Sequence, residues 1–188
     1  NNFTNMIHFK SNIVEDYTKE LKRSTIEILK QNLNDEPVII YEDDIALFDK
    51  NNTNFIINLP YDCDAYYLGY HYFGSGEWEP RERRFINAVV EKVENIDLYK
   101  IKSMMGGHAI LYKSKEYKQK VIKEFEKESE IPSDFILSDL LRKFNVYGRD
   151  KPIFVQDGEL NKHYPVAHFV TNISMTDIKN GKLEKYRC

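Results

Sequence analysis

The sequence predicts an α/β layered domain with a mostly parallel sheet flanked by helices. Short apolar segments alternate along the chain with longer segments whose apolar residues recur at helical spacing. Alternation of this kind is typical of a sheet covered by helices. With 188 residues the chain is long enough for one domain with a hydrophobic core. We therefore expect a single domain over residues 1–188.

The first half of the chain predicts one helix followed by two strands. Residues 13–33 carry apolar side chains at helical spacing among charged ones. The polar segment 34–37 ends in a proline and separates this helix from an apolar strand at 38–41. Residues 64–69 predict a second buried strand that ends at a glycine.

The second half predicts three further strands and two helices. Residues 99–105 are typical of an extended segment, and two glycines separate it from a short apolar strand at 109–112. Ser114 is a suitable cap for a helix that runs to about residue 128. A second helix begins at Ser133, after a proline, and residues 151–156 form the last clear strand.

Composition excludes several classes of partner. The formal net charge is only −3, so no strong positive field attracts nucleic acid or an anionic membrane surface. Cys63 and Cys188 are the two cysteines, which makes a disulfide framework or a thiolate zinc site improbable. No apolar run approaches the roughly 20 residues that span a bilayer, and no signal peptide is recognisable. These features favour a cytoplasmic location.

An acidic triplet, Glu42-Asp43-Asp44, directly follows the strand at 38–41. Adjacent carboxylates repel one another and are costly to bury unless a cation or strong hydrogen-bond donors meet them. Ligands of open α/β sheets bind outside the carboxyl ends of the strands. The triplet therefore indicates a divalent cation that bridges to a phosphorylated ligand. An inert, solvated acidic turn is the alternative.

Five segments in order resemble glycosyltransferase family 25, which includes bacterial lipooligosaccharide glycosyltransferases and procollagen galactosyltransferases. The resemblance covers roughly residues 20 to 160. Its segments are residues 39–44 (IIYEDD), 59–69 (LPYDCDAYYLG), 106–112 (GGHAILY), 131–135 (IPSDF) and 152–156 (PIFVQ).

The resemblance implies a GT-A-type, Rossmann-like fold and a metal-dependent, inverting transfer of a sugar. The donor would be a nucleotide sugar, which we expect to be UDP-linked, and Mn²⁺ or Mg²⁺ would be the cation. The acceptor would be a hydroxyl of a glycan or a protein. The family carries a nucleotide-binding βα unit before the acidic motif, whereas only 41 residues precede Glu42 here. We therefore expect either that the N-terminal part of the domain is incomplete or that the donor pocket is reduced.

The resemblance also implies roles for the acidic triplet. Side chains alternate in direction along a strand end, so Glu42 and Asp44 should share one face. We expect Asp44 to ligate the metal, with Asp43 as a second candidate ligand. We expect Glu42 to accept a hydrogen bond from the ribose or from a metal-bound water. His168 is preferred over His163 as a further metal ligand, and a structural histidine is the alternative.

Three other residues complete the predicted site. Gly107 would let the backbone approach the donor closely and His108 would contact it, although a β-bulge explains the glycine equally well. Asp134 is the predicted catalytic base, since the family places a functional aspartate in this segment. An aspartate in a first helical turn can also simply complement the helix dipole. Asp139 is the second candidate for the base.

Two other functions remain open from the sequence. A metal-dependent phosphodiesterase or nuclease would use the same carboxylates with two metal ions, but the near-neutral net charge counts against it. A non-catalytic GT-A-like module that binds carbohydrate or protein is favoured by the short N-terminal part.

Overall fold

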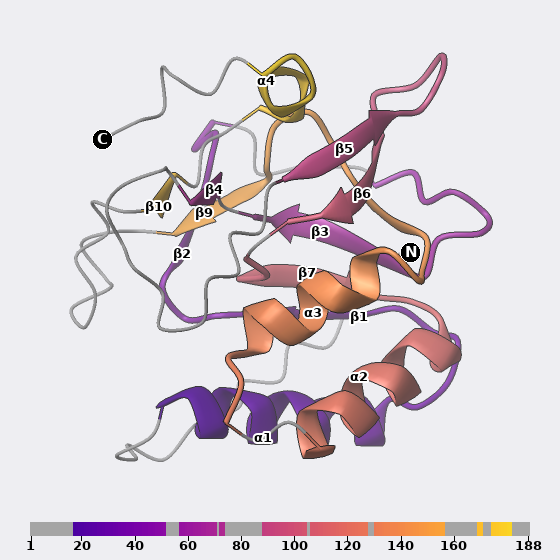
Figure 1. Ribbon diagram of the computed structural model, residues 1–188, viewed down its shortest axis with the longest axis vertical. Helices are drawn as coiled ribbons and strands as arrows, with labels where there is room; N and C mark the ends of the chain where they lie inside the picture. The colour runs from indigo at the N-terminus through magenta and orange to yellow at the C-terminus, as the bar shows by residue number, and fades with distance from the viewer. Residues whose placement is uncertain are drawn as a thin grey trace.

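An open sheet of eight strands forms the centre of the molecule (Figure 1). The computed structural model describes residues 17–51, 57–70, 72–73, 88–104, 106–127, 130–156, 169–170 and 174–181. The main path of the sheet runs in the order β1 (Val38–Tyr41), β7 (Ala109–Tyr112), β3 (Ala65–Gly69), β8 (Val146–Gly148), β6 (Tyr99–Ser103) and β5 (Val89–Lys92). Off this path, β2 (Ile45–Leu47) pairs with β9 (Phe154–Gln156), which also meets β3. A separate small sheet pairs β4 (Tyr72–Phe73) with β10 (Phe169–Val170).

The prediction of a mostly parallel sheet is wrong. Among the described strands of the main sheet, five pairings are antiparallel and two, β3 with β8 and β3 with β9, are parallel. The physical reason is that a strand with apolar residues at every position indicates burial on both faces of the sheet. Parallel sheets are usually buried in this way, but the pattern itself does not indicate the direction of the strand. Here β7 is buried on both faces and runs antiparallel to both of its neighbours.

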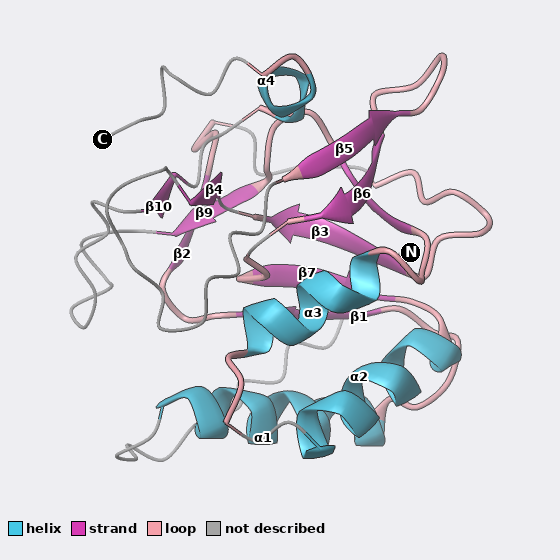
Figure 2. Cartoon of the chain, viewed as in Figure 1, coloured by secondary structure: helices cyan, strands magenta, loops and turns pink. Residues whose placement is uncertain are grey.

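Helices cover one face of this sheet (Figure 2). The helices are α1 (Tyr17–Gln31), α2 (Lys115–Lys127), α3 (Ser133–Leu141) and the short α4 (Met175–Lys179). The first three pack on one another, α3 also contacts β6, and α4 lies beside β5. The three longer helices confirm the helices predicted from periodicity, with ends that differ by a few residues. No helix in the described ranges is long and apolar enough to cross a membrane.

The alternation of side chains along the strands divides the interior into two cores. Tyr67 and Ile110 belong to the core between the sheet and the helices, together with Leu29 of α1. Tyr66 and Leu111 point to the opposite face and form a smaller core with segments that include Leu59 and Cys63. Burial on both faces explains why β3 and β7 are apolar at nearly every position.

A buried lysine connects α2 to the segment that leads into β1. Lys118 is fully buried, and its Nζ donates hydrogen bonds to the carbonyl oxygens of Asn32, Asn34 and Glu36 at 2.8, 2.9 and 2.6 Å. Three carbonyls satisfy the three donors of an ammonium group. The contact holds the chain that ends α1 and begins β1 against the second helix.

We expect Lys118→Met to lower the free energy of unfolding by roughly 2–4 kcal/mol, because it leaves three carbonyls without their donor. Lys123→Met, at an exposed position of the same helix, is the matched control and should change stability by less than about 0.5 kcal/mol. Urea denaturation of both variants measures the difference. Equal stability of the two would mean that water replaces the ammonium group without loss.

Candidate functional site

The ends of four strands meet at one edge of the sheet. Because β1 and β3 are both antiparallel to β7, they run in the same direction, and β9 runs parallel to β3. The carboxyl ends of β1 and β3 therefore lie at the edge where β7 begins, and β9 begins there, with Phe154 paired to Gly69. The Glu42 N–H donates to the carbonyl oxygen of His108 at 2.9 Å and extends the pairing by one residue.

Glu42 and Asp44 both face the side chain of Gln156, although Asp43 and Asp44 form a turn and do not continue the strand. The side-chain amide of Gln156 contacts both carboxylates, with its Nε2 3.4 Å from Glu42 Oε2 and 3.4 Å from Asp44 Oδ2. These distances are longer than a normal N–H···O hydrogen bond, so the amide meets the two carboxylates only weakly. Asp43 between them is exposed.

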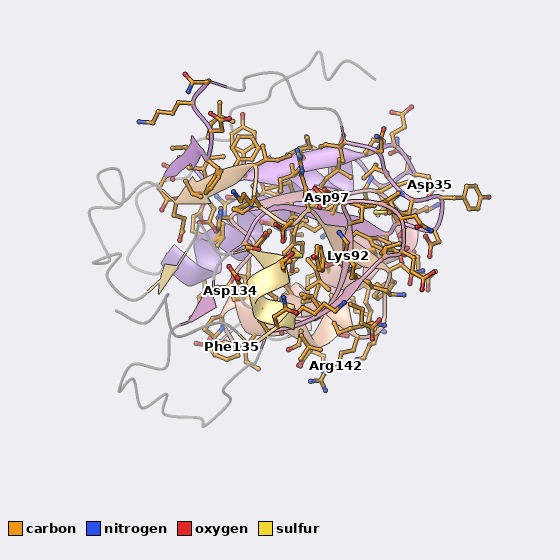
Figure 3. The ribbon with its side chains drawn as sticks, turned by 90° about the horizontal axis from the view of Figure 1, so that it is seen from above. Asp35, Lys92, Asp97, Asp134, Phe135 and Arg142 are labelled. Atoms are coloured by element: carbon orange, nitrogen blue, oxygen red, sulfur yellow. The ribbon has the colours of Figure 1, made fainter. Side chains whose placement is uncertain are left out.

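Asp134 approaches Glu42 from the helical layer. It lies in the first turn of α3, after Pro132, and is half-buried. Its charge is one reason that the pKa of Glu42 is raised to about 8; burial is the larger cause, and Asp44 and Asp43 contribute less. Burial also raises the pKa of Asp134 to about 6. Figure 3 shows Asp134 well apart from the labelled cations Lys92 and Arg142.

A small cleft separates the acidic turn from α3. Its volume is about 40 Å³, which is room for a few water molecules rather than for a nucleotide. Strand, turn and helix residues share its wall, namely Leu21, Thr25, Ile40, Tyr41, Glu42, Gly107, Tyr112, Phe125, Ser133, Asp134 and Leu137. The cleft therefore brings together Glu42, Gly107 and Asp134, three residues of the predicted site, whereas Asp43 and Asp44 do not line it.

Gly107 and His108 have different positions relative to this cleft. Gly107 lines it, and a Cβ added there would lie 2.9 Å from Ile110 Cδ1, so the position has little room for a side chain. His108 is 1% exposed, and its Nε2 lies 3.3 Å from the carbonyl oxygen of Phe154. This position favours a structural role for His108, and contact with a ligand stays a prediction.

The remaining predicted residues are not brought to the cleft by the described structure. His168 and His163 lie outside the described residues, so their roles as metal ligands stay predictions. Asp139 is exposed and does not line the cleft. Within the described ranges, no group of three or more His, Cys, Asp or Glu side chains is arranged to hold a metal ion on its own.

Sequence reasoning missed two residues that complete the site. Gln156 reaches the acidic turn because β9 pairs with β2 and places Ile45 opposite Gln156. Tyr112 lines the cleft from β7, and its pKa is raised above its ordinary value by burial and by the charges of Glu42 and Asp134. A polar residue at the end of a strand was a usable signal for Gln156. No sequence signal distinguishes Tyr112 from a core tyrosine.

The carboxyl groups of Glu42, Asp44 and Asp134 can hold either protons or a cation. Two half-buried carboxyl groups have raised pKa values, and a third, Asp44, lies beside one of them. Near neutral pH, protons on Glu42 reduce the repulsion in the absence of a cation. A cation that enters between the carboxylates replaces those protons, because metal ligands must be deprotonated.

Comparison of the chain with protein-family models, with curated proteins and with solved structures finds no match. The residues of the site therefore carry the functional argument.

The raised pKa of Glu42 predicts that stability falls as the pH rises. The unfolded chain loses this proton near pH 4.5 and the native state near pH 8, so the contribution of the protonated form is lost between these values. We expect Glu42→Gln to be more stable than the parent by roughly 1–2 kcal/mol at pH 8.5, with little difference at pH 4.5.

Denaturant titrations at the two pH values measure this effect. Glu94→Gln, at an exposed position, is the control and should leave the pH profile unchanged. If the free energy of unfolding changes with pH in the same way in Glu42→Gln and in the parent, Glu42 is ionised at neutral pH in the native protein.

Proposed function

We propose that this chain is a glycosyltransferase of the GT-A type. It moves a sugar from a UDP-linked donor to a hydroxyl of a glycan or protein acceptor, with inversion and with Mn²⁺ or Mg²⁺ as cofactor. The observation that carries the proposal is the position of Glu42 directly after β1, where it shares the amide of Gln156 with Asp44 and a cleft with Asp134. The order of the five segments that resemble glycosyltransferase family 25 supports the same function.

The donor set suits a cation that is shared with the substrate. Mg²⁺ and similar hard cations are commonly bound by one or two carboxylates together with substrate phosphates, rather than by a complete protein cage. Glu42 and Asp44 supply two carboxylates, and rotation of the Gln156 side-chain amide would present its oxygen to the cation. When bound, the cation neutralises negative charge on the leaving diphosphate.

Asp134 has the environment that a general base needs. The pKa of about 6 leaves it ionised at neutral pH, yet close enough to neutrality to accept a proton from an acceptor hydroxyl. It lies on α3, on the other side of the cleft from the acidic turn. Glu42 and Asp44 thus hold the donor, and Asp134 activates the acceptor.

A non-catalytic module that binds carbohydrate is the second candidate function. The small volume of the cleft favours it, because a cleft of this size does not enclose a nucleotide sugar. Such a module would bind sugar but would not turn over any donor.

We expect Asp44→Ala to abolish Mn²⁺-dependent turnover of UDP-glucose and UDP-galactose while the thermal midpoint stays close to that of the parent chain. The carboxylate that holds the cation is lost, whereas Asp44 belongs to neither of the two hydrophobic cores. Release of UDP measures the slow hydrolysis that accompanies transfer. Asp49→Ala, at an exposed position after β2, is the control. Turnover at the parent rate in Asp44→Ala would remove the metal hypothesis, and no turnover in the parent would favour the binding module.

Asp134→Asn tests the base separately. We expect a loss of kcat of about 10²- to 10⁴-fold with the affinity for UDP-sugar and Mn²⁺ retained, because the amide cannot accept the proton. Calorimetry measures the affinity and UDP release measures kcat. Asp139→Asn on the same helix is the matched control. If Asp134→Asn instead loses donor affinity, the residue belongs to the donor site.

A further inference from the structure

Tyr41 is an exposed aromatic residue beside the acidic cleft. It is the last residue of β1, it is 44% exposed, and it lines the same cleft as Glu42 and Asp134. A single exposed aromatic ring is common on protein surfaces and needs no explanation by itself. The position of this ring next to half-buried carboxylates distinguishes it from other exposed rings such as that of Tyr61, which does not line the cleft.

The ring of Tyr41 is held in place from behind. It stacks on Phe154 of β9 with 6.4 Å between the ring centroids and 23° between the ring planes. The carbonyl oxygen of Phe154 is in turn contacted by His108 Nε2. Gly69 makes room for this imidazole, since a Cβ there would lie only 2.4 Å from the His108 ring. The aromatic surface therefore exists before any ligand arrives, which lowers the entropic cost of binding.

An aromatic ring beside carboxylates matches the chemistry of an uncharged sugar. One face of a pyranose presents C–H groups that pack on an aromatic ring, and its hydroxyls donate hydrogen bonds to carboxylates. A free phosphate would instead be repelled by the acidic residues around the cleft unless a cation came between them. A nucleobase can also stack on the ring, and competition by uridine distinguishes it from a sugar.

We propose that Tyr41, supported by Phe154, forms with Asp134 the subsite for the acceptor sugar. The role as acceptor rests on the proposed function, whereas the binding of a neutral sugar does not. The sugar ring lies on Tyr41 outside the small cleft, one of its hydroxyls reaches into the cleft toward Asp134, and no cation is required. His108 and Gly69 are positioning residues, because they act on the ring through Phe154.

Saturation-transfer NMR tests the subsite with the methyl glycosides of glucose, galactose, mannose and N-acetylglucosamine, in the presence of EDTA. We expect at least one glycoside to bind, with transfer strongest to the C–H protons of one ring face. Tyr41→Ala should weaken that binding by about tenfold, and Tyr41→Phe should change it by less than about threefold. Tyr61→Ala is the matched control and should bind as the parent does. Circular dichroism establishes that the variants are folded.

Several results would overturn the subsite. They are equal binding by Tyr41→Ala and the parent, binding of none of the four glycosides, or displacement of the bound glycoside from Tyr41 by uridine at lower concentration. The two proposals can also fail separately. Tyr41-dependent sugar binding without Mn²⁺-dependent UDP release rejects the transferase and keeps the subsite. UDP release without Tyr41-dependent sugar binding rejects the subsite alone.

Discussion

The pairing of β7 with β1 on one side and with β3 on the other fixes the position of the acidic turn relative to the end of β3. Tyr41 faces Ala109 across one ladder, and Gly69 faces the same residue across the other. Glu42 extends the first ladder through its bond to His108. Because these contacts are made by the backbone, the position of the acidic turn depends little on which side chains follow it. Only the antiparallel insertion of β7 brings the ends of β1 and β3 to the edge where β7 begins.

The carboxyl groups at this edge of the sheet lower the stability of the fold. Glu42 and Asp134 are half-buried, the charges of Asp134 and Asp44 act on Glu42, and the side-chain amide of Gln156 meets Glu42 and Asp44 only weakly. Such a cluster costs free energy unless protons or a cation reduce its charge. Elsewhere the same protein satisfies a buried charge fully, as the three carbonyls around Lys118 show. The contrast locates the functional region, because natural proteins commonly retain unfavourable electrostatics where a ligand needs them.

The sequence was sufficient for local features and insufficient for those that depend on pairing. Helical periodicity predicted α1, α2 and α3, whereas the two-residue period of a strand end predicted that Glu42 and Asp44 share a face but not that Asp43 and Asp44 form a turn. The direction of β7 was not predictable, because a strand buried on both faces has the same apolar pattern in either direction. Gln156 was missed for a related reason. It lies 112 residues from Asp44, and only the register of β2 against β9 brings the two together.

The acidic turn also links β1 to β2 and so completes a closed path through the paired strands. From β1 the hydrogen bonds lead to β7, then to β3, β9 and β2, and the chain itself returns from β2 to β1 through the three residues of the turn. An extra residue in this turn would shift β2 against β9 or β1 against β7, and a one-residue shift turns every side chain of a strand to the opposite face. The length of the turn is therefore as tightly constrained as its charge, and a change of ligand specificity has to come from substitution there, not from insertion.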